Sequence, residues 1–356
     1  MKMKTLAVAV AALACGTQTL AAEIYNSDGT SMSIGGYVDV GIGEYFEDNV
    51  GIHQVSPRIN VVGKQDIGNG VTVDAKGEWA LNYLDGGDTS FTTRLGYIGA
   101  TYAELGRVVA GTQWSPYYDV AGVADMPIAF ANDFLYYNHG NLGTGRANKM
   151  LSYSNAYEFG DGFGLGLAVG WQGKQTQEST TLEKVVEDCD VKCVVYEKTT
   201  KTVYDDRGQI ALGTELAGFG LGYTYSGGDV KVGTKSESAT SHVISANYGE
   251  YGSGLYAAIV YGMNDHFFTY DGTTYAKTVQ LDGLLAYGVN DWTFSVNYES
   301  VEDDKASKTL YSESAIQAEY AVTSAFYTFA GYQFDLGNDI GNKKNDWWTI
   351  GARYYF

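Results

Sequence analysis

Apolar and polar residues alternate along most of the chain. Segment 31–42 places apolar residues or glycine at its even positions and polar residues such as Asp39 at odd positions. A period of two sends successive side chains to opposite faces of a strand. Segment 71–83 repeats the pattern, with Lys76 and Glu78 on its polar face. No stretch of about ten residues keeps a helical period, so the pattern predicts an all-β chain.

The apolar faces of these predicted strands often end in aromatic residues. A soluble β-sandwich packs its apolar faces with branched aliphatic residues, whereas aromatic girdles mark the two lipid interfaces of a transmembrane barrel. Glycine and polar residues on the other face leave room for a lumen. We therefore expect the apolar faces to contact lipid. The aromatic positions are Tyr83, Trp171, Tyr225, Tyr261, Tyr298, Tyr332 and Tyr354.

Short turn sequences recur at intervals that leave room for two strands and a longer loop. Seven hairpins closed on one side, together with one strand at each terminus, give 16 strands. An even number of strands with both termini at the side of the short turns is typical of outer-membrane barrels. The turns lie at 66–70, 103–106, 160–162, 217–218, 251–254, 290–291 and 323–324.

Composition and charge narrow the class of protein further. The 356 residues include 46 Gly and 30 Tyr but only 3 Pro, and 14% are aromatic, which excludes a disordered chain. A net charge of −19 argues against a nucleic-acid partner. The sequence contains no Gly-x-Ser-x-Gly elbow, Walker loop or metal-binding cysteine cluster, so we expect neither an enzyme nor a cofactor.

Residues 1–21 have the pattern of an export signal. Lys2 and Lys4 precede a short apolar core at 6–14, and small residues lead to a cleavage site after Ala21. The apolar core is too short to span a bilayer. A lipoprotein with acylated Cys15 is the alternative interpretation.

The mature chain, 22–356, is predicted to form one barrel domain with two long connections. The connection at 173–206 is acidic and lacks alternation, which predicts a long extracellular loop. Its Cys189 and Cys193 are candidates for a disulfide in an oxidising compartment; the alternative is that their spacing serves no purpose. The connection at 114–144 is rich in aromatic residues. Such a segment will not stay in water, so we expect it to fold against the inner barrel wall and narrow the lumen.

The chain ends in a further alternating segment, 346–356. Ile350, Tyr354 and Phe356 share one face of this segment. A last strand that ends in Phe at the carboxyl terminus resembles the signal read by the barrel assembly machinery of the outer membrane. We therefore interpret Phe356 as an assembly signal.

Several short segments occur in an order that is found in one protein family. With them the mature chain resembles the trimeric general porins of Gram-negative outer membranes. The resemblance implies a 16-stranded antiparallel transmembrane β-barrel with an inward-folded third loop. It also implies a multi-pass homotrimer that contacts outer-membrane lipid and lipopolysaccharide and passes ions and small hydrophilic solutes. The segments are AEIYNSDG at 22–29, TRLG at 93–96, YDV at 118–120, DM at 125–126, GRAN at 145–148 and SYSN at 152–155.

The resemblance also implies a pore constriction, with wall arginines facing acidic residues of the inward loop. Strand alternation, too, is expected to turn Arg58 and Arg94 inward. The family's usual loop glutamate is missing, and Asp39 stands where the first strand usually carries a basic residue. Further pore-lining candidates are Asp39, Lys76 and Glu78. The constriction residues are expected to be Arg58, Arg94 and Arg146 on the wall, with Asp125 and Asp133 on the loop.

Three functions remain open from the sequence. A general diffusion pore predicts a water-filled lumen with mixed wall charges, because rings of charge bias ion passage. A substrate-specific pore, for example for oligosaccharides, would use the aromatic residues Trp114, Tyr117 and Tyr118 to contact its solute. A structural or adhesive barrel would have no continuous pore. The inward loop favours the diffusion pore.

Overall fold

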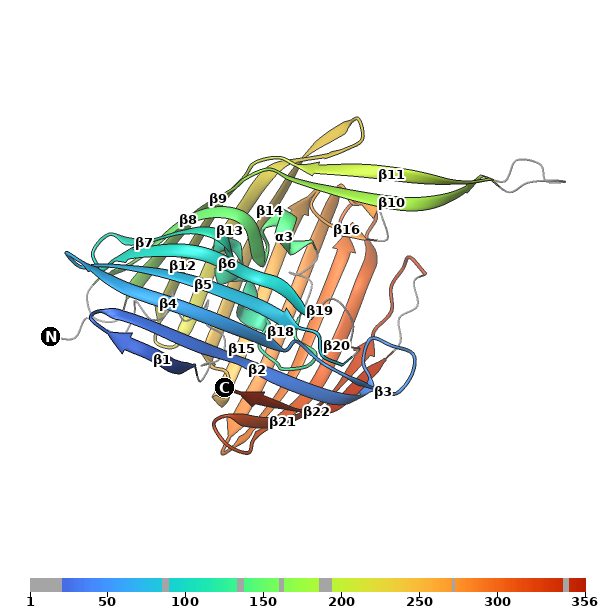
Figure 1. Ribbon diagram of the computed structural model, residues 1–356. Coiled ribbons are helices and arrows are strands. Elements are labelled where there is room, and N and C mark those ends of the chain that lie inside the picture. The colour runs from blue at the N-terminus through green and yellow to red at the C-terminus, as the bar shows by residue number, and fades with distance from the viewer. Residues whose placement is uncertain are drawn as a thin grey trace.

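The computed structural model describes residues 21–84, 90–132, 138–159, 163–185, 194–270, 273–341 and 346–356. Within these ranges the chain is almost entirely β-strand (Figure 1). The first half contains β1 (Ala22–Ser27), β2 (Thr30–Glu44), β3 (Gly51–His53), β4 (Arg58–Gly68), β5 (Val71–Leu81), β6 (Phe91–Tyr102), β7 (Gly106–Trp114), β8 (Arg146–Glu158), β9 (Gly164–Gln172), β10 (Gln175–Val185) and β11 (Val194–Tyr204).

The second half continues the same antiparallel order. Short helices α2 (Pro116–Ala121), η1 (Gly122–Ala124) and α3 (His139–Leu142) all lie between β7 and β8. None of the helices in the described ranges has the length and apolar character needed to cross a bilayer. The remaining strands are β12 (Arg207–Leu216), β13 (Phe219–Val232), β14 (Lys235–Glu250), β15 (Ser253–Asp265), β16 (Thr269–Tyr270), β17 (Thr273–Thr274), β18 (Lys277–Val289), β19 (Trp292–Asp303), β20 (Lys308–Ala321), β21 (Phe326–Asp335) and β22 (Trp347–Tyr355).

The strands close into the predicted 16-stranded antiparallel barrel. The main sheet contains 20 hydrogen-bonded strands. Four of these extend another strand of the barrel: β3 extends β4, β10 extends β9, and β11 extends β12. The fourth, β1, pairs with residues 30–34 of β2, next to the part of β2 that pairs with β22, and so extends β22. Counting each such pair once leaves 16 barrel strands, and within the described residues each of them pairs with a neighbour on both sides.

The short turns also follow the prediction. Six of the seven predicted turns join consecutive barrel strands, from the β4–β5 turn to the β20–β21 turn. The seventh, at 160–162, lies outside the described residues, as do residues 1–20 of the predicted signal peptide. Tight turns on one side leave the longer connections on the other, which is the arrangement of outer-membrane barrels.

The two faces of the sheet differ as alternation predicts. In β2, Val38, Val40 and Ile42 point outward and are exposed, with 44% of Val40 accessible. Their neighbours Tyr37 and Asp39 point inward and are buried, with only 2% of Asp39 accessible. The apolar face therefore meets the membrane, and the polar face lines the interior.

The barrel closes where the first and last strands meet. β2 pairs with β4 on one side and with β22 on the other. Beyond β22, Phe356 exchanges two backbone hydrogen bonds with Gly36, each 3.1 Å long. Gly36 has φ +153°, and a Cβ there would lie 2.2 Å from the Arg58 carbonyl oxygen. A glycine is thus required where three segments converge.

An ion pair crosses this closure on the inner face. Asp39 of β2 and Arg353 of β22 are register partners. Arg353 Nε and Nη2 lie 3.0 and 2.9 Å from Asp39 Oδ2, and both side chains are buried. The amides of Val55 and Ser56 also donate to the Asp39 carboxylate, at 2.8 and 3.4 Å. The same carboxylate therefore holds the segment between β3 and β4 inside the barrel.

The connection predicted as a long loop at 173–206 is largely a β-hairpin. β10 and β11 pair from Gln175–Tyr204 to Val185–Val194 and extend well beyond the barrel (Figure 1). The sequence missed these strands because a hairpin outside the membrane has no apolar face to impose alternation. Cys189 and Cys193 lie outside the described residues.

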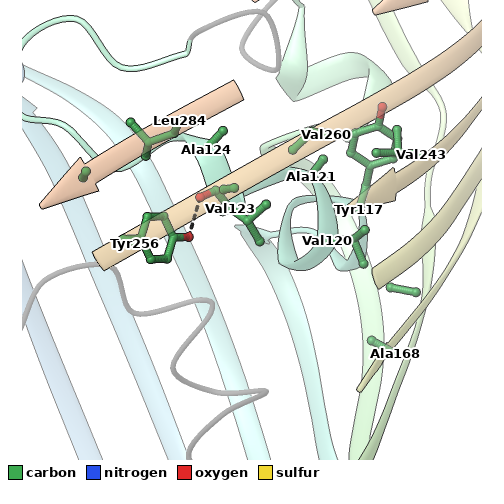
Figure 2. Close-up of a cluster of buried hydrophobic side chains, with 13 residues drawn as sticks. Tyr117, Val120, Ala121, Val123, Ala124, Ala168, Val243, Tyr256, Val260 and Leu284 are labelled. Carbon is green, nitrogen blue, oxygen red and sulfur yellow. Dashed lines mark hydrogen bonds between the residues drawn. The ribbon is translucent and has the colours of Figure 1, made fainter. Parts of the chain in front are cut away.

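The connection between β7 and β8 packs on the inner face of the barrel. Tyr117 and Val120 of α2 and Val123 of η1 meet Val243 and Val260 of the wall in a buried apolar cluster (Figure 2). The Tyr117 hydroxyl contacts Ser241 Oγ at 2.9 Å, and the Tyr256 hydroxyl donates to the Val123 carbonyl at 2.6 Å. The apolar side chains of this loop are thus buried against the inner wall of the barrel, where a water-soluble protein would bury them in a hydrophobic core.

Farther along the same loop, wall side chains bind the backbone. The Gln317 side chain accepts from the Phe130 amide at 3.0 Å and donates to the Phe130 carbonyl at 2.7 Å. Asn297 donates to that carbonyl too, and Glu319 accepts from the Ile128 amide at 2.7 Å. Gly331 makes room, because a Cβ there would lie 2.9 Å from the Phe130 ring. Side chains of β19 and β20 thus supply the hydrogen bonds that the backbone of a neighbouring strand would otherwise give to this part of the loop.

We expect Asp39→Asn to weaken the barrel closure. Removing one partner of a buried ion pair leaves the other charge uncompensated, which costs about 3–5 kcal/mol. The temperature at which the folded barrel converts to the unfolded form on a detergent gel should therefore fall. Asp291→Asn, in the exposed β18–β19 turn, is the matched control and should leave it unchanged. Equal transition temperatures for both variants would contradict the role of the pair.

We expect Gln317→Ala to loosen the inward loop without disrupting the barrel. The buried Phe130 amide loses its partner, at a cost of about 1–3 kcal/mol, whereas the Phe130 carbonyl keeps the hydrogen bond from Asn297. Current noise in single open channels should increase. Gln333→Ala removes the same side chain from the inner face of β21, where it binds Glu313 instead of the loop. If the two variants show the same noise, the loop is not held by Gln317.

Candidate functional site

Three cationic side chains converge on one carboxylate of the inner wall. Glu78 of β5 accepts a hydrogen bond from Arg94 Nε at 3.0 Å. Lys76 Nζ lies 3.1 Å from the other oxygen of Glu78, and Arg58 Nη1 lies 3.9 Å from the first. The sequence-predicted residues Arg58, Arg94, Lys76 and Glu78 are therefore one group, with more positive than negative charge.

Arg94 reaches this group through a β-bulge. Alternation counted from Ile98, which is 69% exposed, would turn Arg94 outward as well. The register between β5 and β6 shifts, however, so that Glu78 faces Leu95 while Trp79 faces Thr93. The extra residue in β6 is Arg94, and bulges of this kind redirect a side chain. Arg94 thus points inward as expected, but it does so because of the bulge and not because of simple alternation.

The basic wall extends to a residue that the sequence analysis did not select. The guanidinium groups of Arg58 and Arg353 lie 4.7 and 4.1 Å from the centre of the Tyr37 ring, so both cations contact the same ring. In segment 346–356, alternation puts Arg353 on the face that does not carry the exposed Ile350, so the sequence pattern could have identified Arg353 as an inward residue. The predicted lining residue Asp39 is covered, because Arg353 and the segment at 55–56 bind its carboxylate.

A second group links the base of the inward loop to the wall. Arg146 and Trp114 are register partners, and the guanidinium lies 6.0 Å from the Trp114 ring centre. Trp114 stacks on Tyr118 with 4.2 Å between ring centres. The Tyr118 hydroxyl donates to Asp125 Oδ2 at 2.7 Å. Two predicted aromatic residues therefore connect the predicted cation Arg146 to the predicted carboxylate Asp125.

Tyr117, the remaining aromatic candidate of the loop, does not join this group. Tyr117 turns to the wall, where it is only 1% exposed and its hydroxyl meets Ser241. Asp133 lies outside the described residues. Only Trp114 and Tyr118 of the three aromatic candidates are therefore partly exposed on the loop.

Acidic residues gather on a different part of the inner wall. Asp282, Glu299, Glu313 and Glu319 lie on β18, β19 and β20 and are buried on the inward face. Sequence analysis did not select them, because their proximity depends on the register of strands far apart in the chain. A lumen with cations on one side and carboxylates on another produces a transverse field, which biases ion passage.

The sequence and the fold are similar to those of known outer-membrane porins. A family model described as Gram-negative porin matches residues 7–356. Outer membrane protein S2 of Salmonella typhi is 27% identical, over 100% of this chain and 89% of the relative. Outer membrane porin N of Escherichia coli strain K12 is 28% identical, over 95% of this chain and 78% of the relative.

Solved structures agree on the fold. Salmonella typhi OmpF, solved as a complex with daunomycin, superposes with a TM-score of 0.73 at 20% identity, over 94% of this chain and 100% of that one. An anion-selective porin from Comamonas acidovorans gives a TM-score of 0.68 at 14% identity, over 92% of this chain and 100% of that one. Since the family model spans nearly the whole sequence, the chain belongs to the Gram-negative porin family.

Proposed function

We propose that this outer-membrane porin is a general diffusion channel narrowed by its inward loop. As a porin it is a channel for passive diffusion of ions and small hydrophilic solutes. The packing of Tyr117, Val123 and Phe130 on the inner wall carries the proposal, because it fixes the loop inside the lumen. No reaction is involved; the wall only sorts solutes by size and charge.

The proposed constriction has Arg58, Arg94 and Arg146 on the wall and Asp125 and Asp133 on the loop. The contacts of Arg58 and Arg94 with Glu78 support the wall group. The chain from Arg146 through Trp114 and Tyr118 to Asp125 supports the loop side. Polar solutes would exchange hydration for these charged groups, whereas apolar solutes would have to displace ordered water.

A substrate-specific pore is the second candidate, favoured by the stacked Trp114 and Tyr118 rings. Aromatic faces bind sugar rings through their apolar surface, so this pair is a candidate contact for an oligosaccharide. The burial of Tyr117 removes the third residue of that candidate platform. The general pore is therefore the better supported of the two.

Assembly and processing complete the proposal. We infer cleavage after Ala21, recognition of Phe356 by the barrel assembly machinery and a Cys189–Cys193 disulfide. We further infer a homotrimer in contact with lipid and lipopolysaccharide. A single barrel with an apolar outer flank is suited to cyclic assembly. Native mass measurement in mild detergent tests the trimer, and monomers alone would refute it.

Liposome swelling tests the diffusion channel directly. Vesicles containing the purified porin should swell in sugars of increasing size at rates that fall smoothly with size. A diffusion pore gives no preference among stereoisomers of one size, because size and charge alone decide passage. Swelling with one oligosaccharide much faster than with its isomers would favour the substrate-specific pore instead.

We expect Arg94→Ala and Asp125→Asn to shift ion selectivity in opposite directions. Loss of a fixed positive charge raises the local cation concentration, and loss of a fixed negative charge lowers it. Zero-current potentials under a low-salt gradient measure both shifts, since the Debye length is then about 30 Å at 0.01 M. Arg94→Lys retains the charge and is the matched control. Unchanged potentials for both charge-removing variants would exclude these residues from the constriction.

A further inference from the structure

The connection between β15 and β18 carries two consecutive phenylalanines that are both buried. Phe267 is 5% exposed and Phe268 is 4% exposed. The chain turns at His266, whose φ of +48° lies in the left-handed region that residues other than glycine rarely adopt. The His266 amide donates to the Ala276 carbonyl at 3.1 Å, and the Tyr275 amide donates to the Phe268 carbonyl at 3.0 Å. These hydrogen bonds hold the two sides of the connection together next to the two rings.

Phe267 packs against the inward loop from the side of the long connections. It belongs to a buried apolar cluster that also contains Leu142 of α3 and Ala239 of β14. Its ring stacks with the Tyr117 ring of α2, with 6.4 Å between the ring centres and 19° between the planes. Ala239 has the same parity on β14 as Ser241, which contacts the Tyr117 hydroxyl, so Phe267 lies inside the barrel. One side chain of this connection therefore joins the wall to both α-helices of the inward loop.

Phe268 turns to the opposite side of the connection. It belongs to a second buried cluster, with Val301 of β19 and Leu310 of β20. Val301 has the same parity on β19 as Asn297, which binds the inward loop, so this cluster also lies on the inner face. Successive side chains of an extended segment point to opposite sides. The two rings thus fasten the connection to the inner wall at two places, one beside α3 and one on β19 and β20.

Phe267 also covers a buried cation that makes no ion pair within the described part of the chain. Arg207 of β12 is 1% exposed. Its guanidinium donates to the Ala239 carbonyl at 3.0 Å and lies 5.2 Å from the centre of the Phe267 ring. The face of an aromatic ring attracts a desolvated cation. The Phe267 ring therefore replaces part of the hydration that Arg207 has lost.

Polar groups beside the connection are buried without hydrogen bonds. Asn264 of β15 and its register partner Thr278 of β18 flank the connection and are 3% and 2% exposed. Within the described residues, neither the Asn264 amide group nor Thr278 Oγ1 has a hydrogen-bond partner, and Arg207 Nε has none. Such groups favour a hydrated arrangement over a packed one. The contacts of the two phenylalanine rings therefore hold the connection in place against the hydration of these groups.

We propose that the connection between β15 and β18 is a second inward element of the pore, and that Phe267 positions the inward loop through it. Gln317 holds the loop at Phe130, whereas Phe267 contacts its helical part at Tyr117 and Leu142. The connection narrows the lumen on the side of the long connections, so a solute that enters there passes it before the constriction. The inference rests on the proposed diffusion channel and adds a positioning residue that limits the size of solutes.

Polymer exclusion in single channels tests this proposal. Polyethylene glycols of graded mass are added to one side of the bilayer at a time, and a polymer that enters the pore lowers its conductance. In Phe267→Ala, larger polymers should enter from the side of the long connections, because the connection and the helices lose their shared contact. Current noise should increase as well. The size limit from the side of the tight turns should stay as in the wild type, since the wall still holds residues 128–130.

Three further variants keep the test decisive. Phe267→Leu retains an apolar contact with Leu142 and should keep the wild-type size limit. Phe294→Ala makes the same change as Phe267→Ala at a lipid-facing position of β19 that is 47% exposed, and should also keep this limit. Leu142→Ala removes the other half of the contact and should shift the limit in the direction expected for Phe267→Ala, even if Phe267→Ala fails to fold.

Two results would overturn the proposal. One is the same size limit in Phe267→Ala and Phe294→Ala, and the other is an equal shift from both sides of the bilayer. Either result with normal potassium chloride conductance would leave the diffusion function intact. A wild-type chain without conductance would refute that function itself.

Discussion

Hydrogen bonding of the backbone in a medium without water is the constraint on which this structure depends. In the bilayer every strand edge must be paired, so the sheet has to close. Closure brings β2 against β22 and joins Gly36 to Phe356. The Asp39–Arg353 pair lies across this same closure, on the side that faces the lumen. A buried ion pair on the inner face thus also holds the two ends of the barrel together.

The same constraint explains the loop inside the barrel. A segment that enters a partly dry lumen needs partners for its amides and carbonyls. Gln317, Asn297 and Glu319 supply them for residues 128–130, while apolar contacts bury the helical part. The inner face on that side is polar and also acidic, because Glu299, Glu313 and Glu319 lie on β19 and β20. The basic groups lie around Glu78 and Tyr37 instead.

Local pattern predicted the fold well, because alternation and tight turns are properties of neighbouring residues. The inward loop was expected from the length of the connection at 114–144, from its apolar and aromatic content and from the family resemblance. Alternation did not account for Arg94, whose orientation depends on a bulge in β6. It could have identified Arg353 from the parity of the last strand. The acidic group on β18, β19 and β20 could not be predicted, since it depends on the register of these strands.

Single-channel recording in a planar bilayer tests the central claim, an open water-filled lumen with a fixed internal loop, most directly. We predict a stable open conductance that rises in proportion to bulk salt conductivity. Added sugars should lower it only as far as they lower the conductivity of the solution. A conductance that saturates with salt, or that low concentrations of one sugar abolish, would contradict a general diffusion pore. A barrel without measurable conductance would contradict the channel altogether.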